Sequence, residues 1–258
     1  MTAGSLTVVG TGIRMGVHLT PEARAAIDAA DELLHLAADP LGEEWLTGLH
    51  PRSTSLRSEY NVGESREAIY ERIVERMLAP VRNGLRVAAA FYGHPGVYVR
   101  PTHEAIRRAH AEGFEARMLP AVSAEDCLYA DLNIDPATTG CASYDATDFL
   151  LRPPTIDTAS GLILWQITVI GDPNAVAEPR LDNVHALVER LARDYPLDHG
   201  VVVYEASPYP VAEPVIERVT LRALPDAPLT PLSTLYVPPA TVREFDREVA
   251  VRLGFSTH

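Results

Sequence analysis

The feature that most constrains the fold is a short apolar run that ends in two glycines, LRVAAAFYGHPG at residues 85–96. The run carries small and β-branched residues without polar alternation, which is typical of a strand whose two faces are both covered. Such strands occur in parallel sheets that helices flank on both sides. We therefore expect an α/β fold, with this strand inside a sheet and the loop 93–96 at its carboxyl end.

The first half of the chain alternates between strand-like and helix-like segments. Thr20 is a suitable N-cap with Pro21 at the first helical position, which predicts a helix over TPEARAAIDAADELLH. The helix PTHEAIRRAHAEG is predicted to end at Gly113, and Ser123 and Asp126 have the spacing of a capping box at the start of SAEDCLYADLNI. Further predicted elements are the strands SLTVVGTGI and FEARMLP and the helix ESREAIYERIVERMLAPVRNG, whose apolar residues form one stripe.

The second half is richer in strands. Its strand-like segments are GLILWQITVIG, HGVVVYEAS, PVIERVTLRAL and PLSTLYVPP, and its clearest helix is LDNVHALVERLARDY. This change in the pattern of strands and helices predicts two α/β subdomains, residues 1–120 and 121–240. A short C-terminal helix and tail follow over residues 241–258.

Composition excludes several classes of function. A net charge of −13 repels phosphates, so neither nucleic acid nor an anionic membrane is expected as the main partner. The apolar runs are too short to span a bilayer, and the N-terminal sequence has no secretory signal pattern. Cys127 and Cys141 make neither a disulfide framework nor a metal set, which favours reduced thiols. We expect a cytoplasmic protein.

Two glycine motifs follow predicted strands. In VVGTGIRMG the third glycine comes four residues after the second, whereas a dinucleotide-binding fingerprint requires three, so we interpret the motif as a tight turn. The motif GHPG lies where open α/β sheets bind ligands, although a plain turn explains it equally well. A metal is not expected there, because His94 and His103 have no further ligand at a suitable spacing.

Two groups of polar residues remain ambiguous from spacing alone. Arg66 and Tyr70 are four apart and share a helix face, just after Tyr60; taken in isolation, a solvated arginine and a packing tyrosine explain them. Gln166 and the pair 233–234 fall inside apolar strands. These polar groups are either satisfied by neighbouring backbone or face a ligand.

In chain order, several segments resemble the tetrapyrrole-methylase superfamily and, within it, the borosin peptide α-N-methyltransferases. The resemblance extends from Gly4 to Pro239, and YGHPGV with MLPAVSAEDCLYADL is its most specific part. The other matching segments are AGSLTVVGTGI, LTPEARAAIDAADELLH, AEGFEAR, NIDP, ASYDATDFLLR and STLYVPP. The resemblance implies a tetrapyrrole-methylase-like fold of two α/β subdomains with a cofactor cleft between them.

The resemblance also implies S-adenosyl-L-methionine as the cofactor and assigns two sets of residues. The catalytic residues of the family match Tyr60, Arg66 and Tyr70. The cofactor-contacting positions of the family match Tyr92, His94, Pro95, Gly96, Val97, Ser123, Ala124, Gln166, Ala206, Ser233 and Thr234. The glycines of GHPG would let the loop backbone approach the cofactor closely.

The reaction of the borosin enzymes accounts for these residue types. An amide nitrogen is a poor nucleophile because its lone pair is delocalised into the carbonyl group. Arg66, which is permanently cationic, can stabilise the negative charge that develops on the carbonyl oxygen. A tyrosine, with an ordinary pKa of about 10, can become a phenolate near neutral pH beside Arg66 and a sulfonium. We expect Tyr70 or Tyr60 as the general base, and no metal is needed.

The sequence departs from the fungal borosin enzymes in two ways. They have another tyrosine where this chain has Arg57, and they carry their own peptide substrate as a C-terminal extension, whereas this sequence stops at His258. We therefore expect the split form, which methylates a separate precursor peptide in trans and iteratively. We also expect a homodimer, alone or with two precursor chains.

Two alternatives stay open. One is a methyltransferase of the same fold that acts on a tetrapyrrole or another small molecule. The other is a catalytically silent protein that binds S-adenosyl-L-methionine and serves as a scaffold for the precursor.

Overall fold

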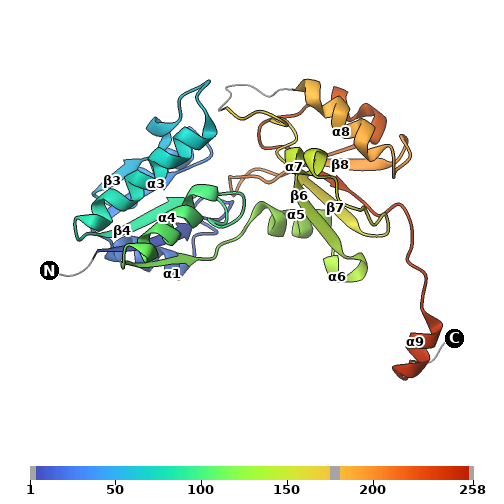
Figure 1. The fold of residues 1–258 in the computed structure, drawn as a ribbon, viewed down its shortest axis with the longest axis horizontal. Coiled ribbons are helices and arrows are strands. Elements are labelled where there is room, and N and C mark those ends of the chain that lie inside the picture. Colours follow the sequence, from blue (N-terminus) through green and yellow to red (C-terminus); the bar gives the residue numbers. More distant parts are fainter. Residues whose placement is uncertain (1–3, 175–180, 256–258) are drawn as a thin grey trace.

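The computed structural model describes residues 4–174 and 181–255, whose strands form two five-stranded sheets (Figure 1). The first sheet is built from residues before Pro120 and the second from residues after it. Helices pack against both sheets, so the α/β fold expected from the sequence is confirmed. The predicted subdomain boundary after residue 120 falls between the last strand of the first sheet and the helix that opens the second half.

The first sheet is entirely parallel, in the order β3-β2-β4-β1-β5. The apolar run discussed above forms β4, which lies between β2 and β1 with Ala88, Ala89 and Ala90 fully buried. Small side chains let helices approach this strand from both faces. The strands are β1 (Ser5–Gly10), β2 (Glu32–Leu36), β3 (Ser53–Ser55), β4 (Arg86–Phe91) and β5 (Glu115–Leu119).

Helices cover both faces of this sheet. On one face, α3 (Arg66–Arg82) and α4 (Arg100–Ala111) pack their buried residues against the strands. On the other face lie α1 (Pro21–Ala29) and α2 (Pro40–Thr47). A short 3₁₀ turn, Arg57–Glu59, precedes α3.

One predicted helix is shorter than its sequence pattern. The helix that begins at the Thr20 N-cap ends at Ala29, and the following ELLHL forms β2 rather than a last helical turn. In β2, Leu33 packs into the core beneath α1 and α2, and Leu34 packs into the core beneath α3 and α4. Pairing with β4 and burial on both faces override the local helical propensity of this segment.

The second sheet is mixed, in the order β6-β7-β10-β8-β9. Only β6 and β7 are parallel to each other, and the other pairs are antiparallel. The strands are β6 (Cys141–Asp145), β7 (Gly161–Trp165), β8 (Gly200–Glu205), β9 (Val215–Thr220) and β10 (Thr234–Val237). The helices are α5 (Ala124–Leu132), α6 (Pro136–Thr139), α7 (Ala146–Leu151) and α8 (Val184–Leu191), with 3₁₀ turns Leu181–Asn183 and Leu221–Asp226.

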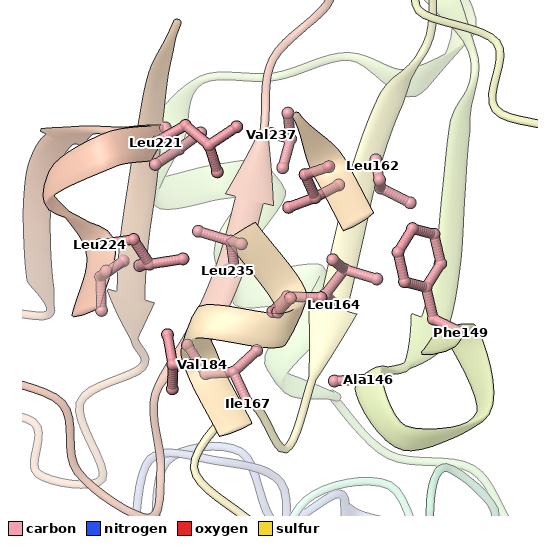
Figure 2. Packing of buried hydrophobic residues seen from close by; sticks show 14 of the residues in the cluster. Ala146, Phe149, Leu162, Leu164, Ile167, Val184, Leu221, Leu224, Leu235 and Val237 are labelled. Carbon is pink, nitrogen blue, oxygen red and sulfur yellow. The ribbon is translucent and has the colours of Figure 1, made fainter. Parts of the chain in front are cut away.

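Alternate residues of β7 and β10 point to the two faces of the second sheet. Figure 2 shows Leu162 and Leu164 of β7 beside Leu235 of β10, packed beneath α8 and against Phe149 of α7. On the opposite face, Ile163 packs with Leu128 of α5. The alternation gives the second half a complete core of its own.

The short C-terminal helix that the sequence predicted is present as α9 (Arg247–Arg252). Figure 1 shows the chain leaving the second sheet after β10 and carrying α9 away from both sheets. Within the described residues, no helix has the length and apolar character needed to cross a bilayer.

Candidate cofactor and catalytic site

A cavity of about 240 Å³ lies between the two halves of the chain, at the carboxyl ends of β1, β4, β7 and β8. β4, β7 and β8 contribute residues that end or directly follow them, and β1 contributes Ile13 from the turn after it. Open α/β sheets bind ligands at such strand ends. The residues that line the cavity are Ile13, Tyr92, Gly93, His94, Val97, Tyr98, Ser123, Ala124, Trp165, Gln166, Ala206, Pro231, Leu232, Ser233 and Thr234.

Most of the residues that the sequence assigned to a cofactor lie on this cavity. They come from three places: the loop after β4, the start of α5, and the ends of the strands of the second sheet. The assigned residues on the cavity are Tyr92, His94, Val97, Ser123, Ala124, Gln166, Ala206, Ser233 and Thr234. Pro95 and Gly96 are not among its lining residues.

Pro95 and Gly96 shape the loop after β4. The backbone amide of Gly96 donates to His94 Nδ1 at 3.0 Å, which leaves Nε2 to carry the proton of a neutral His94 ring. The Pro95 carbonyl accepts from Thr102 Oγ1 at 2.6 Å, and the Gly96 carbonyl lies 2.9 Å from His103 Nε2. These bonds tie the loop to the first turns of α4, so His94 is held in place by its own loop.

The first glycine motif packs directly against that loop. Gly12 and Gly93 exchange two backbone hydrogen bonds, at 3.2 and 3.0 Å, and both have a positive φ, of 67° and 71°. These left-handed conformations are inexpensive only for glycine. The backbone amides of Val17 and His18 both donate to the Arg14 carbonyl, so the chain turns within VVGTGIRMG as interpreted, and Gly12 holds this segment against the cavity loop.

The polar residues that the second half contributes to the cavity wall are held by hydrogen bonds within that half. Ser123 caps α5 in the predicted capping box, since its hydroxyl accepts from the Asp126 amide while the Asp126 carboxylate accepts from the Ser123 amide. Ser233 donates to Glu205 Oε1 at 2.5 Å, and Thr230 Oγ1 donates to the same oxygen at 2.7 Å. Glu205 thus holds the loop before β10 in place. The sequence did not predict this role, because Glu205 stands there only as the last residue of an apolar strand.

Arg66 connects α3 to the cavity. It is the first residue of α3, and its Nη1 donates to the side chain of Gln166 at 3.4 Å. Its Nε donates to the Asn174 carbonyl at 3.2 Å, and its backbone amide donates to the Pro173 carbonyl at 3.0 Å. The candidate catalytic arginine of the first half therefore meets a cavity residue of the second half.

Tyr60 lies close enough to both Arg66 and Tyr70 to interact with each of them electrostatically. Tyr60 remains 37% exposed, and its partial burial raises its pKa to about 12; proximity to Tyr70 adds to the rise, and the Arg66 cation opposes it. Tyr70 packs at the edge of the core beneath α3 and lines a charged groove between α3 and α4. Tyr60 therefore lies near both other candidates, and of the three it is Arg66 whose bond to Gln166 reaches the cavity lining.

The raised pKa of Tyr60 favours the neutral form of its hydroxyl. With a pKa of about 12, the Tyr60 hydroxyl stays protonated at neutral pH. Tyr60 is suited to donate a hydrogen bond in this form, and the choice between Tyr60 and Tyr70 as the general base stays a prediction. Arg57, which replaces a family tyrosine, is exposed at the start of the 3₁₀ turn.

Several cavity residues were not assigned from the sequence. They are Ile13, Gly93, Tyr98, Trp165, Pro231 and Leu232. Tyr98 is also one of the described non-glycine residues with a positive φ, together with Asn133 and Gln166. Nothing in the local pattern YVRP marks Tyr98, because its contacts lie in the other half of the chain. Among the described residues, no cluster of histidine, cysteine, aspartate and glutamate that could hold a metal is found.

Residues 5–225 match the sequence profile of the Tetrapyrrole (Corrin/Porphyrin) Methylases. This chain belongs to the tetrapyrrole methylase family. Solved structures of the family share its fold: uroporphyrin-III-C-methyltransferase from Thermus thermophilus superposes with a TM-score of 0.65 at 21% identity, covering 92% of this chain and 94% of that one. A cobalt precorrin-4 methyltransferase gives a TM-score of 0.65 at 18% identity, covering 91% and 94%.

Within the tetrapyrrole methylases, the chain is similar to precursors of ribosomally synthesized peptides. It is 40% identical to the methyltransferase/cyclic peptide gymnopeptides precursor of Gymnopus fusipes, over 97% of this chain and 61% of the relative. It is 39% identical to the methyltransferase/omphalotin A precursor of Omphalotus olearius, over 97% and 61%. The chain thus spans about three fifths of the length of these relatives.

Proposed function

We propose that this tetrapyrrole methylase uses S-adenosyl-L-methionine to α-N-methylate backbone amides of a precursor peptide supplied as a separate chain, at successive residues. The similarity to precursors whose names combine a methyltransferase with a cyclic peptide supports a peptide substrate. The observation that carries the proposal is the Arg66–Gln166 contact. It links a residue suited to amide activation with the cavity suited to the cofactor.

The residues of the cavity fit this cofactor. A sulfonium cation is stabilised by aromatic faces, and the cavity offers Tyr92, Tyr98 and Trp165. Its polar groups, Gln166 among them, can hydrogen-bond a ribose and an amino-acid group. Next to the cavity residue Gly93 the backbone is so closely packed that a Cβ on Gly10 would collide with the Gly93 carbonyl oxygen. When bound there, S-adenosyl-L-methionine supplies an activated methyl group on its sulfur.

Arg66 and the two tyrosines near it have different roles in activating the substrate amide. The Arg66 guanidinium binds the carbonyl oxygen of the substrate amide and stabilises the negative charge that builds there. Tyr70, in its phenolate form, takes up the amide proton on its oxygen, directly or through a water molecule, so that the nitrogen becomes nucleophilic. Tyr60, which remains protonated, donates a hydrogen bond that orients the peptide. The bonds from Arg66 to Gln166 and Asn174 keep the guanidinium at the cavity rim.

The roles of the two tyrosines differ in their dependence on pH. Because the pKa of Tyr60 is raised to about 12, its neutral form persists to a higher pH than in a free tyrosine, whose pKa is about 10. We expect the rate of methylation to rise with pH between pH 7 and about 10, as the base loses its proton. Tyr60→Phe should lower this rate without changing the pH at which it rises. The measurement is single-turnover methylation across this range. A rise that shifts or disappears in Tyr60→Phe would identify Tyr60 as the base instead.

Mass spectrometry tests the proposed substrate and its supply in trans. The protein is coexpressed with a candidate precursor peptide supplied as a separate chain, and tandem fragmentation of the recovered peptide locates any added methyl groups. We expect a ladder of peptides, each one methyl group heavier than the last, with the methyl groups on backbone nitrogens. An unmodified peptide together with methylation of uroporphyrinogen III would replace the proposal with the small-molecule alternative. Binding of S-adenosylhomocysteine without any methylation would favour the silent scaffold.

We further propose that two copies of the chain associate, alone or with two precursor chains. The support is the arm formed by residues 239–255, which Figure 1 shows leaving the second sheet and which exposes Val242, Phe245 and Phe255. Exposed apolar residues gathered on one segment mark an interaction surface. Light scattering tests the pairing: we expect twice the chain mass for the unsubstituted protein and a single chain for Phe245→Asp. A single chain in both samples would refute it.

A further inference from the structure

Tyr98 reaches across the cleft from the first half of the chain to the second. It lies in the loop between β4 and α4, and its ring centroid is 5.5 Å from that of Trp165, the last residue of β7, at an interplanar angle of 43°. Both rings line the cavity, but Trp165 is buried while Tyr98 is 43% exposed. Tyr98 is therefore the outer member of an aromatic pair at the cavity wall.

The backbone of Tyr98 adopts a conformation that an aromatic residue rarely takes. Its φ of 57° lies in the left-handed region, where a side chain is strained unless its surroundings hold it. Strain of this kind is concentrated at ligand clamps. Gln166, the residue after Trp165, has a φ of 59° and lines the same cavity. Two strained residues thus meet at one cavity from opposite halves of the chain.

A hydrogen-bond network behind the pair holds both rings. Ser143 Oγ accepts from Trp165 Nε1 at 2.7 Å and also bonds to the side chain of Tyr98. It donates to Glu125 Oε2 at 3.1 Å, and the other carboxylate oxygen of Glu125 accepts from the Tyr129 hydroxyl at 2.9 Å. Every member except Tyr98 belongs to the second half of the chain. The network therefore fixes the wall from which the exposed Tyr98 ring can detach.

We propose that Tyr98 is a cofactor-retaining residue, which closes the cavity by packing on Trp165, with Ser143 and Glu125 as the positioning residues behind it. The inference rests on the proposed use of this cavity by S-adenosyl-L-methionine and its demethylated product. The Tyr98 ring leaves Trp165 to let the product out and returns over the next cofactor. An enzyme that methylates one peptide many times must exchange the demethylated product for new cofactor between successive transfers. The movement of Tyr98 therefore controls the rate of this exchange.

The rate of product dissociation tests this role without requiring turnover. Trp45 and Trp165 are the tryptophans of the chain, so a Trp45→Phe background leaves Trp165 as the fluorescent reporter. Calorimetry first establishes that S-adenosylhomocysteine binds. Stopped-flow association traces at increasing ligand concentration then give the dissociation rate from their intercept and the association rate from their slope.

Two substitutions separate the ring from the strained backbone. Tyr98→Gly removes the ring and relieves the φ strain, whereas Tyr98→Ala removes the ring and keeps the strain. We expect both to speed dissociation of S-adenosylhomocysteine by about tenfold or more, and Tyr98→Phe, which keeps the ring and loses the bond to Ser143, to speed it less. Ser143→Ala should raise the dissociation rate and shift the emission of Trp165, whose indole loses its acceptor.

The outcomes separate this inference from the proposed function. Dissociation from Tyr98→Gly within about twofold of the unsubstituted rate overturns the retaining role, because the ring is then dispensable. If only Tyr98→Ala speeds dissociation of S-adenosylhomocysteine, backbone strain and not the loss of the ring is the cause. This outcome also overturns the retaining role of the Tyr98 ring. If the unsubstituted protein does not bind S-adenosylhomocysteine, the proposed function fails and this inference fails with it.

Discussion

Replacing Arg66 with alanine is expected to slow peptide methylation by about 100- to 1,000-fold, which is the usual effect of removing one donor that stabilises a developing oxyanion. The guanidinium is the cationic group that the structure holds at the cavity rim, through Gln166 and the Asn174 carbonyl. Arg66 itself is not among the residues that line the cavity. Cofactor affinity should therefore change far less than the rate. Single-turnover methylation and calorimetry with S-adenosylhomocysteine measure the two effects separately.

Two further substitutions make the Arg66 result specific. Arg66→Lys keeps the charge but loses the planar pair of donors, so it should recover only a small part of the rate. Arg82→Ala removes an arginine from the other end of α3, where it pairs with Glu75 and Glu112 at the surface, and should leave the rate unchanged. A rate for Arg66→Ala within about tenfold of the unsubstituted protein would remove Arg66 from the reaction, since a lost oxyanion donor has a larger effect.

The parts of the fold that could be predicted from the sequence are those specified by local chemistry. The unbroken apolar run of β4 predicted a strand covered on both faces, and Thr20 with Pro21 marked the start of α1 correctly. Resemblance to the family then assigned positions such as Gln166, which lines the cavity. In each case the information lies within one segment or in a motif shared with relatives.

The features that the sequence did not reveal depend on contacts between distant segments. The strand β2 has a helical pattern locally and becomes a strand because it pairs with β4. Tyr98 has no distinguishing neighbours, yet its ring packs on Trp165, far along the chain. The high pKa of Tyr60 likewise arises from burial in the folded chain and from Tyr70. Such properties follow from the way separate segments pack in the folded chain, which no single segment encodes.

Replacing Gly10 with alanine is expected to have the largest effect on stability and to impair cofactor binding with it. A Cβ at this position would overlap the Gly93 carbonyl oxygen and would lie 2.5 Å from Ala121 Cβ and 2.6 Å from Pro95 Cδ. None of these atoms can rotate away, because each belongs to the backbone, to a proline ring or to a Cβ. The substitution must therefore push β1 away from the loop after β4 and from the segment that joins the two halves.

We expect Gly10→Ala to lose about 2–4 kcal/mol of unfolding free energy, as for severe overpacking. Displacing the same loop also moves the cavity wall, so affinity for S-adenosylhomocysteine should fall by about tenfold or more, because a displaced wall loses contacts with the ligand. Gly200→Ala is the matched control: a Cβ there has nothing within 4 Å, and its stability should change by less than about 0.5 kcal/mol. Urea-unfolding midpoints and calorimetry measure both variants. If Gly10→Ala matches the control in both, β1 and the cavity loop do not pack as closely as described. If it loses stability but binds normally, the loop does not form the cofactor wall.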